Sequence, residues 1–313
     1  MCETEGDKIP LFLQYWWMEA VCYGKNWDVA LAYKKEGEIV GALPYLIGKR
    51  WGMRYIVQPQ LTQYNGPWYR FPDGVNERKR IQFQYDVDKQ LIEHLKKLKL
   101  AFFSQNFGPH AKNHLAYHWE GFCQTTRYSY RLEDISNPMD LLDGMSPKNR
   151  RYKIENLMPT VDVVSDITPE ELARMQNACL EQQGKRNVMA NDFVVRVAST
   201  AIERGNGVIV GLKKRDNGQI LGMGFAVYDR ECAYALITAY PKNSDSQSIN
   251  TCLFWALIKE LSPRTKAFDF EGSMDQGIEY FFRSFGASQS PYHHIWRCNN
   301  PIVKPIIEPM IRQ

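Results

Sequence analysis

The fold of this chain is decided by the stretch Phe268-Asp-Phe-Glu-Gly-Ser-Met-Asp-Gln-Gly-Ile-Glu-Tyr-Phe-Phe-Arg-Ser-Phe-Gly-Ala287. Its first residues predict a short buried strand that ends in two carboxylates, Asp269 and Glu271. Ser273 followed by Gln276 is a capping-box pattern, which predicts that a helix begins there. The apolar residues beyond it recur at i, i+3, i+4 and i+7, as on one face of a helix. Carboxylates at a strand end beside helix amides mark the place where open α/β sheets bind ligands.

The composition indicates an ordinary globular protein of up to two domains. The chain has 313 residues, of which 44% are hydrophobic and 24% charged, so disorder is excluded. The formal net charge of +4 permits an anionic ligand but does not by itself argue for nucleic acid, and we expect no DNA partner.

The cysteines and the hydropathy pattern favour the cytosol. Seven cysteines are scattered without a C-x-x-C pair, which indicates neither a disulfide framework nor a zinc module. The acidic N-terminus has the wrong sign for a signal peptide. Because the chain contains no run of about 18 apolar residues, no transmembrane segment is expected.

The order of predicted elements indicates two related α/β halves. A faint repeat supports this reading, since Ala30–Gly41 resembles Val210–Gly222 and each segment predicts a hairpin at a similar place in its half. A boundary is expected near residues 137–151, where two prolines give helix-start signals. The predicted helices cover 10–23, 76–98, a segment from Thr168, a segment around 193–202, and 248–261; the predicted strands cover 28–34, 39–47, 101–105, 122–132, 160–165, 208–214, 220–228 and 233–239.

Metal and nucleophile chemistry have little support. His110, His114 and His118 are four apart, but Gly-Pro precedes them and no carboxylate stands at matching spacing, so surface or structural roles are favoured over metal binding. The sequence has no G-x-S-x-G, Walker or G-x-G-x-x-G motif, which leaves covalent serine chemistry and nucleotide hydrolysis without a signature.

Two polar segments are candidate binding elements. Lys148-Asn-Arg-Arg-Tyr-Lys153 is a basic cluster that would bind phosphate through Lys148, Arg150 and Arg151 together with a helix start, or would form a solvated helix face. The long loop before residue 68 is typical of functional loops. Its side chains Tyr64, Asn65 and Trp68 suit a polar substrate, or alternatively pack on the surface.

The carboxylates of the first stretch allow proton transfer. Since Asp269 and Glu271 are two residues apart, they are expected on the same strand face. One of them is expected to be structural, and the other to deprotonate an attacking amine. Tyr292, on the next predicted strand, is positioned to donate a proton to a leaving group.

These segments together resemble the FemAB-like proteins of the GNAT acyltransferase superfamily. The resemblance extends from about Phe12 to Trp296, and its most specific part is the closing run of 268–287 followed by Pro291-Tyr292. Supporting parts are Leu61–Gly66, Trp119–Phe122 with Tyr128–Arg131, and Asn149–Arg151.

The resemblance implies an α/β (α+β) fold of two GNAT-like domains, each a mixed, mostly antiparallel sheet flanked by helices. The expected domains are 1–145 and 146–300, with a tail, 301–313, packing back on the body. The implied activity is direct transfer of an acyl or aminoacyl group from an activated donor to an amine, with no metal and no permanently bound cofactor. Such catalysis rests on positioning the two substrates and on stabilising the oxyanion.

The donor and acceptor stay open at this stage. The glycine-rich pyrophosphate loop of ordinary GNAT enzymes is missing, and Lys242–Asn250 stands in its place, with Ser246, Gln247 and Ser248 as the residues whose helix start would bind a donor phosphate. The donor is then acyl-CoA or aminoacyl-tRNA, and the acceptor a small molecule or an envelope precursor. The alternatives are a Fem-type tRNA-dependent peptidoglycan precursor ligase and a catalytically silent ligand-binding module.

Overall fold

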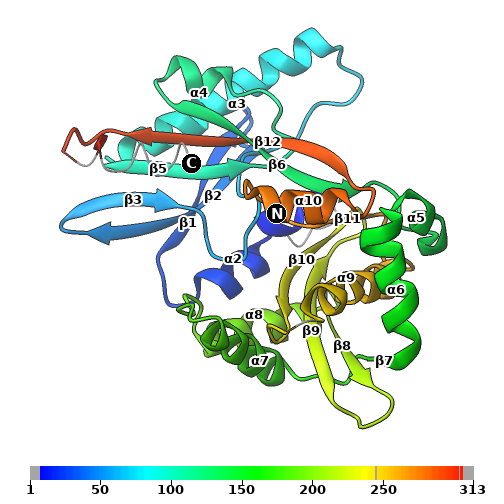
Figure 1. Cartoon of the computed structure of the whole chain (residues 1–313). Helices are drawn as coiled ribbons and strands as arrows, with labels where there is room; N and C mark the ends of the chain where they lie inside the picture. Colours follow the sequence, from blue (N-terminus) through cyan, green and yellow to red (C-terminus); the bar gives the residue numbers. More distant parts are fainter. Residues whose placement is uncertain (1–7, 244, 303, 306–313) are drawn as a thin grey trace. The chain divides into compact units, whose positions relative to one another are not determined.

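The computed structural model describes residues 8–243, 245–302 and 304–305 (Figure 1). The chain divides into two compact units, which we call unit 1 (1–128 and 291–313) and unit 2 (129–290). Unit 1 is formed from two separate stretches of the chain, because residues 291–313 group with residues 1–128 and not with unit 2. The domain boundaries expected after residues 145 and 300 stay predictions, and most of the predicted tail lies outside the described residues.

Unit 1 is a mixed, mostly antiparallel sheet covered by helices. Within it, β1, β2 and β3 pair antiparallel, β4 pairs with β2, β3 runs parallel to β5, and β5 pairs antiparallel with β12. The long helix α3 packs on β1 and β2. The elements are η2 (Leu11–Leu13), α2 (Tyr15–Cys22), β1 (Trp27–Tyr33), β2 (Ile39–Arg50), β3 (Met53–Val57), β4 (Trp68–Tyr69), α3 (Glu77–Lys97), β5 (Phe102–Phe107), α4 (Leu115–Trp119) and β12 (Ser288–Cys298).

A carboxylic acid is buried under α3. Asp88 is fully buried, and its Oδ1 accepts a hydrogen bond of 2.7 Å from the hydroxyl of Tyr69, which in turn accepts one from Gln84. Burial raises the pKa of Asp88 to about 8, although the hydrogen bonds from Tyr69 and Gln84 oppose the rise. Unit 1 therefore holds an acid that is largely protonated at neutral pH.

Asp88 makes the stability of unit 1 depend on pH. Because its pKa is higher in the folded state than in the unfolded chain, its contribution is fully present below about pH 4 and is lost as the pH rises through about 8. We expect Asp88→Asn, which cannot ionise, to become more stable than the wild type by an amount that grows over this range, measured by urea unfolding. The exposed Asp86→Asn on the same helix is the control. Parallel pH profiles for the wild type and Asp88→Asn would contradict the assignment.

Unit 2 holds a second mixed sheet, in which β7, β8, β9 and β10 pair antiparallel in that order. Then β11 runs parallel to β10 and pairs antiparallel with the end of β6. The elements are β6 (Cys123–Leu132), α5 (Pro138–Gly144), η3 (Pro147–Arg151), α6 (Tyr152–Leu157), η4 (Met158–Thr160), β7 (Val161–Val164), α7 (Pro169–Gln182), α8 (Asn191–Glu203), β8 (Gly207–Lys214), β9 (Ile220–Tyr228), β10 (Cys232–Ala239), α9 (Ser246–Leu261), β11 (Ala267–Asp269) and α10 (Gln276–Arg283).

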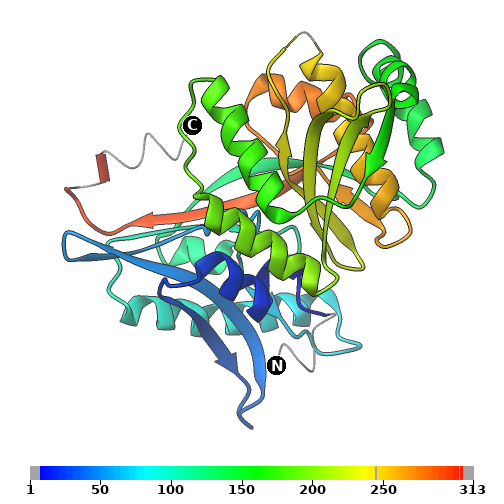
Figure 2. The ribbon, with the colours of Figure 1, turned by 90° about the horizontal axis from the view of Figure 1, so that it is seen from below.

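Both faces of the central strands in unit 2 are covered. The strand β9 is apolar and buried along nearly its whole length, as expected for a strand with helices on both sides. Helix α9 packs on one face, and α7 and α8 lie on the other (Figure 2). Two glycines let α9 approach closely, since a Cβ on Gly222 or Gly224 would lie 3.0–3.1 Å from leucine side chains of α9.

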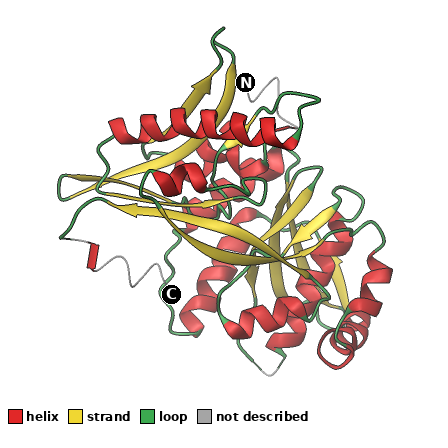
Figure 3. Ribbon diagram, turned by 90° about the horizontal axis from the view of Figure 1, so that it is seen from above, coloured by secondary structure: helices red, strands yellow, loops and turns green. Residues whose placement is uncertain are grey.

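The repeated sequence forms two equivalent hairpins, β1–β2 and β8–β9. In the first, the register shifts between Ala32 and Tyr33; in the second, it shifts between Leu212 and Lys213, the matching positions. The predicted strands and helices of both units are present, apart from local differences at their ends. One such difference is residues 10–23, where a short 3₁₀ helix and α2 are separated at Gln14. Figure 3 shows the helices and strands of the two units by colour.

Candidate functional site

The strand that opens the deciding stretch ends inside a cluster of phenylalanines. Strand β11 is completely buried, and Phe270, just beyond it, packs against Phe254 of α9 and Phe282 of α10, with ring centroids 5.3 Å apart in each pair. This packing holds the backbone at Phe270, and therefore determines where the next residue, Glu271, begins its turn.

Glu271 follows in a left-handed conformation, with φ of 55°. For a residue with a Cβ this conformation is strained, and such strain gathers at functional sites. Two hydrogen bonds hold the turn: the amide of Glu271 donates to Asp269 Oδ1 at 2.8 Å, and the amide of Gly272 donates to Ser129 Oγ at 3.0 Å. The Ser129 hydroxyl also donates to Asp269 Oδ1, so Ser129 and Asp269 hold the turn as one hydrogen-bonded pair. Asp269 is thus the structural carboxylate of the pair.

The carboxyl group of Glu271 is unusual. Its Oε1 is buried and has no hydrogen-bond partner among the described residues, although the residue as a whole is partly exposed. Burial, and then the charge of Asp269, raise the pKa of Glu271 well above its ordinary value. A buried carboxyl with a raised pKa is a better proton acceptor, once ionised, than a solvated one. Glu271 is the candidate for proton transfer.

Two details predicted for this stretch are wrong. The two carboxylates do not share a strand face, because β11 ends at Asp269 and Glu271 lies in the left-handed turn after it. Ser273 does not cap the helix; the N-cap is Asp275, whose Oδ1 accepts from the amides of Gly277 and Ile278. An Asp at this place satisfies two amides at once.

A cavity of about 450 Å³ opens in unit 2 at the start of α9. It is lined by residues of η3, α6, α9 and α10 and by the end of β10. Glu271 does not line it, but its neighbour Phe270 packs on Phe254 and Phe282, which do.

Arg150 is the buried cation of this cavity. Only 3% of its surface is exposed, and its guanidinium lies 3.9 Å from the ring centroid of Phe281. Its Nη1 donates to Thr251 Oγ1 at 3.1 Å and its Nε donates to the carbonyl oxygen of Phe281 at 3.4 Å, so its contacts include a neutral hydroxyl, a backbone carbonyl and an aromatic face. Burial lowers the pKa of Arg150 to about 10, and the group stays protonated at neutral pH.

Lys153 adds a second cation to the same wall. Its Nζ donates to Gln247 Oε1 at 2.8 Å, and its pKa is lowered by burial and by the charge of Arg150. Two cations that repel each other across a partly buried cavity favour an anion between them. The wall of the cavity therefore carries positive charge from both side chains.

The helix start predicted to bind the donor adjoins these cations. Ser246 and Gln247 line the cavity, whereas Ser248 does not. The Ser246 hydroxyl accepts from the amide of Asn243 and closes the preceding loop, and the N-cap residue makes no side-chain capping hydrogen bond. The first amides of α9 are the kind of group that binds phosphate.

The other predicted residues of the basic cluster behave differently. Arg151 is exposed and forms ion pairs with Asp143 and Glu155, at 3.3 and 2.7 Å, as a solvated helix face would. The side chain of Lys148 lies outside the described residues. Of the two members whose side chains are described, Arg150 lines the cavity together with Ser246 and Gln247, and Arg151 does not.

The remaining predicted residues belong to unit 1, where they are buried. The rings of Tyr64 and Tyr292 pack edge to face with centroids 5.0 Å apart. Asn65 donates to the Sδ of Met18, and the indole of Trp68 donates to the carbonyl of Lys8. Packing accounts for these contacts, and their roles toward a substrate or a leaving group stay predictions.

Sequence reasoning missed two residues, Lys153 and Ser129, as individual contributors. For Lys153 a signal existed: it stands three residues after Arg150, which places both on one side of a helical turn, with Arg151 on another. For Ser129 no local signal existed, because its partner Asp269 is 140 residues away in the sequence.

Searches for other kinds of site give negative results over the described residues. They contain no group of three His, Cys, Asp or Glu side chains placed to hold a metal ion. Their six cysteines are free thiols. None of their helices combines the length and the apolar character needed to cross a bilayer.

Comparison with known proteins identifies the class of fold. Residues 148–277 match the family model of an acetyltransferase (GNAT) domain, a segment that contains the cavity lining from Arg150 to Gly277 but not the four lining residues of α10 that follow. A search of curated protein sequences found no significant match.

Several solved structures share the fold over most of the chain. FemX superposes with a TM-score of 0.68 at 14% identity, covering 95% of this chain and 94% of FemX. L-PGS from Bacillus licheniformis gives 0.54 at 12% identity, with 96% and 95% covered. A tandem GNAT protein from the clavulanic acid biosynthesis pathway gives 0.53 at 13% identity, with 88% and 83% covered. The chain therefore contains a GNAT domain, and its fold over most of its length is that of FemX and of a tandem GNAT protein, as the resemblance predicted.

Proposed function

We propose that this protein is an N-acyltransferase that takes an acyl group from a phosphate-bearing donor such as acyl-CoA and transfers it directly to an amine. One observation carries the proposal: the buried Arg150 and the half-buried Lys153 line one cavity with Ser246 and Gln247 at the start of α9. The match of the surrounding segment to a GNAT acetyltransferase domain supports it. The donor phosphates would bind the two cations and the first amides of α9.

Glu271 would be the general base that accepts the proton of the amine. As the amine nitrogen bonds to the acyl carbon and the carbon–sulfur bond of the donor breaks, the ionised Glu271 would take the proton lost by the nitrogen. The departing thiolate must gain a proton, and Tyr292 stays the proposed donor of it. Because the pKa of Glu271 is raised, the rate should increase as the pH rises through that pKa.

A second candidate donor is aminoacyl-tRNA, used as in a Fem-type ligase acting on a peptidoglycan precursor. The similarity to FemX over nearly the whole of both chains favours it, together with the replacement of the glycine-rich loop by Lys242–Asn250. The acceptor would then be an envelope precursor rather than a small molecule. A cytosolic location suits both donors and stays a prediction.

Thermal unfolding in the presence of candidate donors tests the proposal. We expect CoA at 100-fold excess over its Kd to stabilise the protein by about 2.7 kcal/mol. Stabilisation by aminoacyl-tRNA but not by CoA would select the second candidate. Binding of CoA without transfer to any of a panel of amines would indicate a silent ligand-binding module, and no stabilisation by either donor would refute the proposal.

A further inference from the structure

An exposed tryptophan stands among cations at the turn between β2 and β3. Trp51 is 78% exposed, and the guanidinium of Arg50 lies 4.4 Å from its ring centroid. Trp51 and Gly52 both have positive φ, 49° and 79°, as in the tight two-residue turns that join antiparallel strands. Tryptophan is enriched at protein interfaces and at the interfaces between membrane and water, where one part of the ring is in an apolar environment and another is wet.

A second exposed apolar residue lies beside this turn. A hollow of about 680 Å³ joins Met53 and Arg54 to Asn300 and Pro301. The side-chain amide of Asn300 lies 3.0 Å from the Sδ of Met53, and Ile302, two residues later, is 81% exposed. Figures 1 and 3 show the β2–β3 turn and the segment after β12 at the same end of the unit 1 sheet.

Cations surround these apolar side chains. Lys97 and Lys99, at the end of α3, line the same hollow as Arg54. Arg54 also lines a second hollow of about 620 Å³ with Lys49 and Lys25. We call the resulting surface the hairpin-end surface; it consists of Lys49, Arg50, Trp51, Arg54, Lys97, Lys99 and Ile302.

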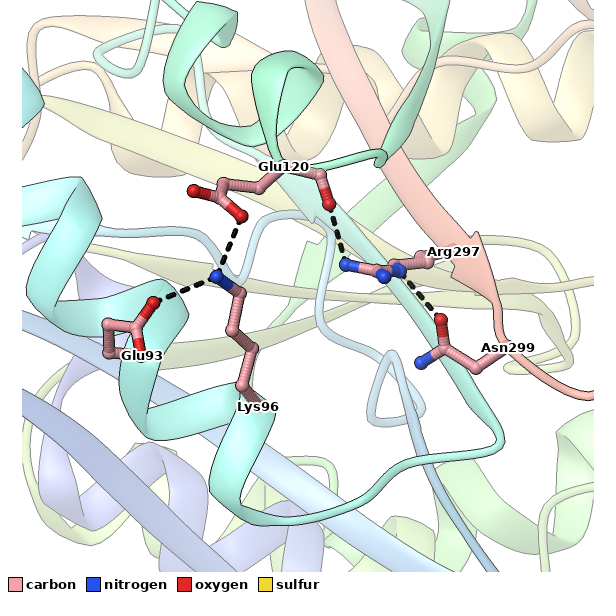
Figure 4. A network of polar contacts seen from close by, with 5 residues as sticks. All are labelled: Glu93, Lys96, Glu120, Arg297 and Asn299. Carbon is pink, nitrogen blue, oxygen red and sulfur yellow. Dashed lines mark hydrogen bonds and ion pairs between the residues drawn. The ribbon is translucent and has the colours of Figure 1, made fainter.

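The acidic side chains near this surface form their hydrogen bonds and ion pairs with residues other than its cations. In the network of Figure 4, Lys96 Nζ pairs with Glu93 at 2.8 Å and with Glu120 at 2.7 Å, while Arg297 donates to the carbonyl of Glu120 and to Asn299. In the second hollow, Glu19 accepts from the indole of Trp27, and Asp28 accepts from the amide of Val29.

Four cations of the surface itself form no ion pair of this kind. Across the described part of the chain, no carboxylate forms an ion pair with Lys49, Arg54, Lys97 or Lys99. The surface therefore combines four cations that have no carboxylate partner among the described residues with two apolar side chains, Trp51 and Ile302, that are largely exposed.

We propose that the hairpin-end surface docks on an anionic phospholipid bilayer. The cations would face the headgroup phosphates, and Trp51 and Ile302 would enter the interfacial layer, where tryptophan is enriched. A nucleic acid would satisfy the cations but would give Ile302 no partner, and a small anion would fill one hollow only. A bilayer matches both features at once. This inference does not depend on the proposed transferase activity.

Vesicle flotation with the full chain tests the docking. We expect binding to vesicles of phosphatidylcholine with one third phosphatidylglycerol, little binding to phosphatidylcholine alone, and weakening by salt. Lys97→Gln and Lys99→Gln should each reduce the partition coefficient about fivefold. Trp51→Ala should reduce it about tenfold or more.

Matched control variants distinguish docking through the hairpin-end surface from non-specific binding of the protein to vesicles. Trp119→Ala removes a tryptophan that is 64% exposed but lines neither hollow, and Lys89→Gln removes an exposed lysine of α3. Neither should change the partition, and all variants should keep the wild-type unfolding temperature. The proposal is overturned if anionic vesicles do not bind, if the controls weaken binding as much as the hairpin-end variants, or if a single-stranded RNA binds more tightly and loses affinity in Trp51→Ala.

Discussion

Replacing Glu271 by glutamine is expected to lower kcat about 10²- to 10⁴-fold, the contribution typical of a positioned general base. The amide keeps the size and the position of the side chain but cannot accept the proton of the attacking amine. The buried Oε1 and the raised pKa of this carboxyl are the physical reasons to expect so large an effect. The KM for the donor should stay nearly constant, because Glu271 does not line the donor cavity.

Stability and pH provide independent checks on Glu271. An acid whose pKa is raised by folding destabilises the protein as the pH rises above its unfolded value, so Glu271→Gln should be at least as stable as the wild type at neutral pH. The rate increase with pH should disappear in this variant. The exposed Glu203→Gln on α8 is the matched control and should leave kcat unchanged. Full activity of the Glu271→Gln variant would contradict the assignment of Glu271 as the general base.

Replacing Arg150 by methionine is expected to weaken donor binding about 10- to 100-fold, the value of a hydrogen bond between charged groups. Methionine fills much of the volume beside Phe281 and has no charge, so the anion would lose its buried partner. Calorimetry with CoA measures the Kd directly. The loss should appear in the Kd and the KM of the donor more than in kcat.

Arg151 provides the control for this experiment. It is adjacent in sequence and has the same charge, but it is exposed and paired with Asp143 and Glu155. Arg151→Met should therefore change the Kd less than twofold, since exposed ion pairs contribute little. Equal losses in the two variants would show that overall charge, rather than the buried cation, governs binding.

The sequence predicted correctly most features that depend on a few neighbouring residues. The order of strands and helices, the hairpin repeat and the helix starts at Pro138, Pro147 and Thr168 depend on neighbouring residues, and the structure contains all of them. The resemblance carried by the residues from 268 to 287 likewise identified the GNAT-like fold. Where two local signals competed, as for Ser273 and Asp275 at the start of α10, the choice between caps was wrong.

The candidate site was predictable only in part. Arg150, Ser246 and Gln247 were recognised as residue types suited to phosphate, yet nothing in the sequence showed that they line one cavity. The different roles of Asp269 and Glu271 also required the structure. The cause is a turn after β11 that is held by Ser129, far away in the sequence.

The sequence by itself determined the fold class: a chain of alternating strands and helices in which residues 267–283 form a strand, two carboxylates and an amphipathic helix. Periodicity, caps and turns act over a few residues, so they can be read directly from the order of the amino acids. Only the tertiary structure decided which carboxylate lies in a strained turn with a buried oxygen that lacks a hydrogen-bond partner among the described residues, and which arginine is enclosed. Burial and charge depend on all the atoms that surround a group, and most of these atoms come from distant parts of the chain.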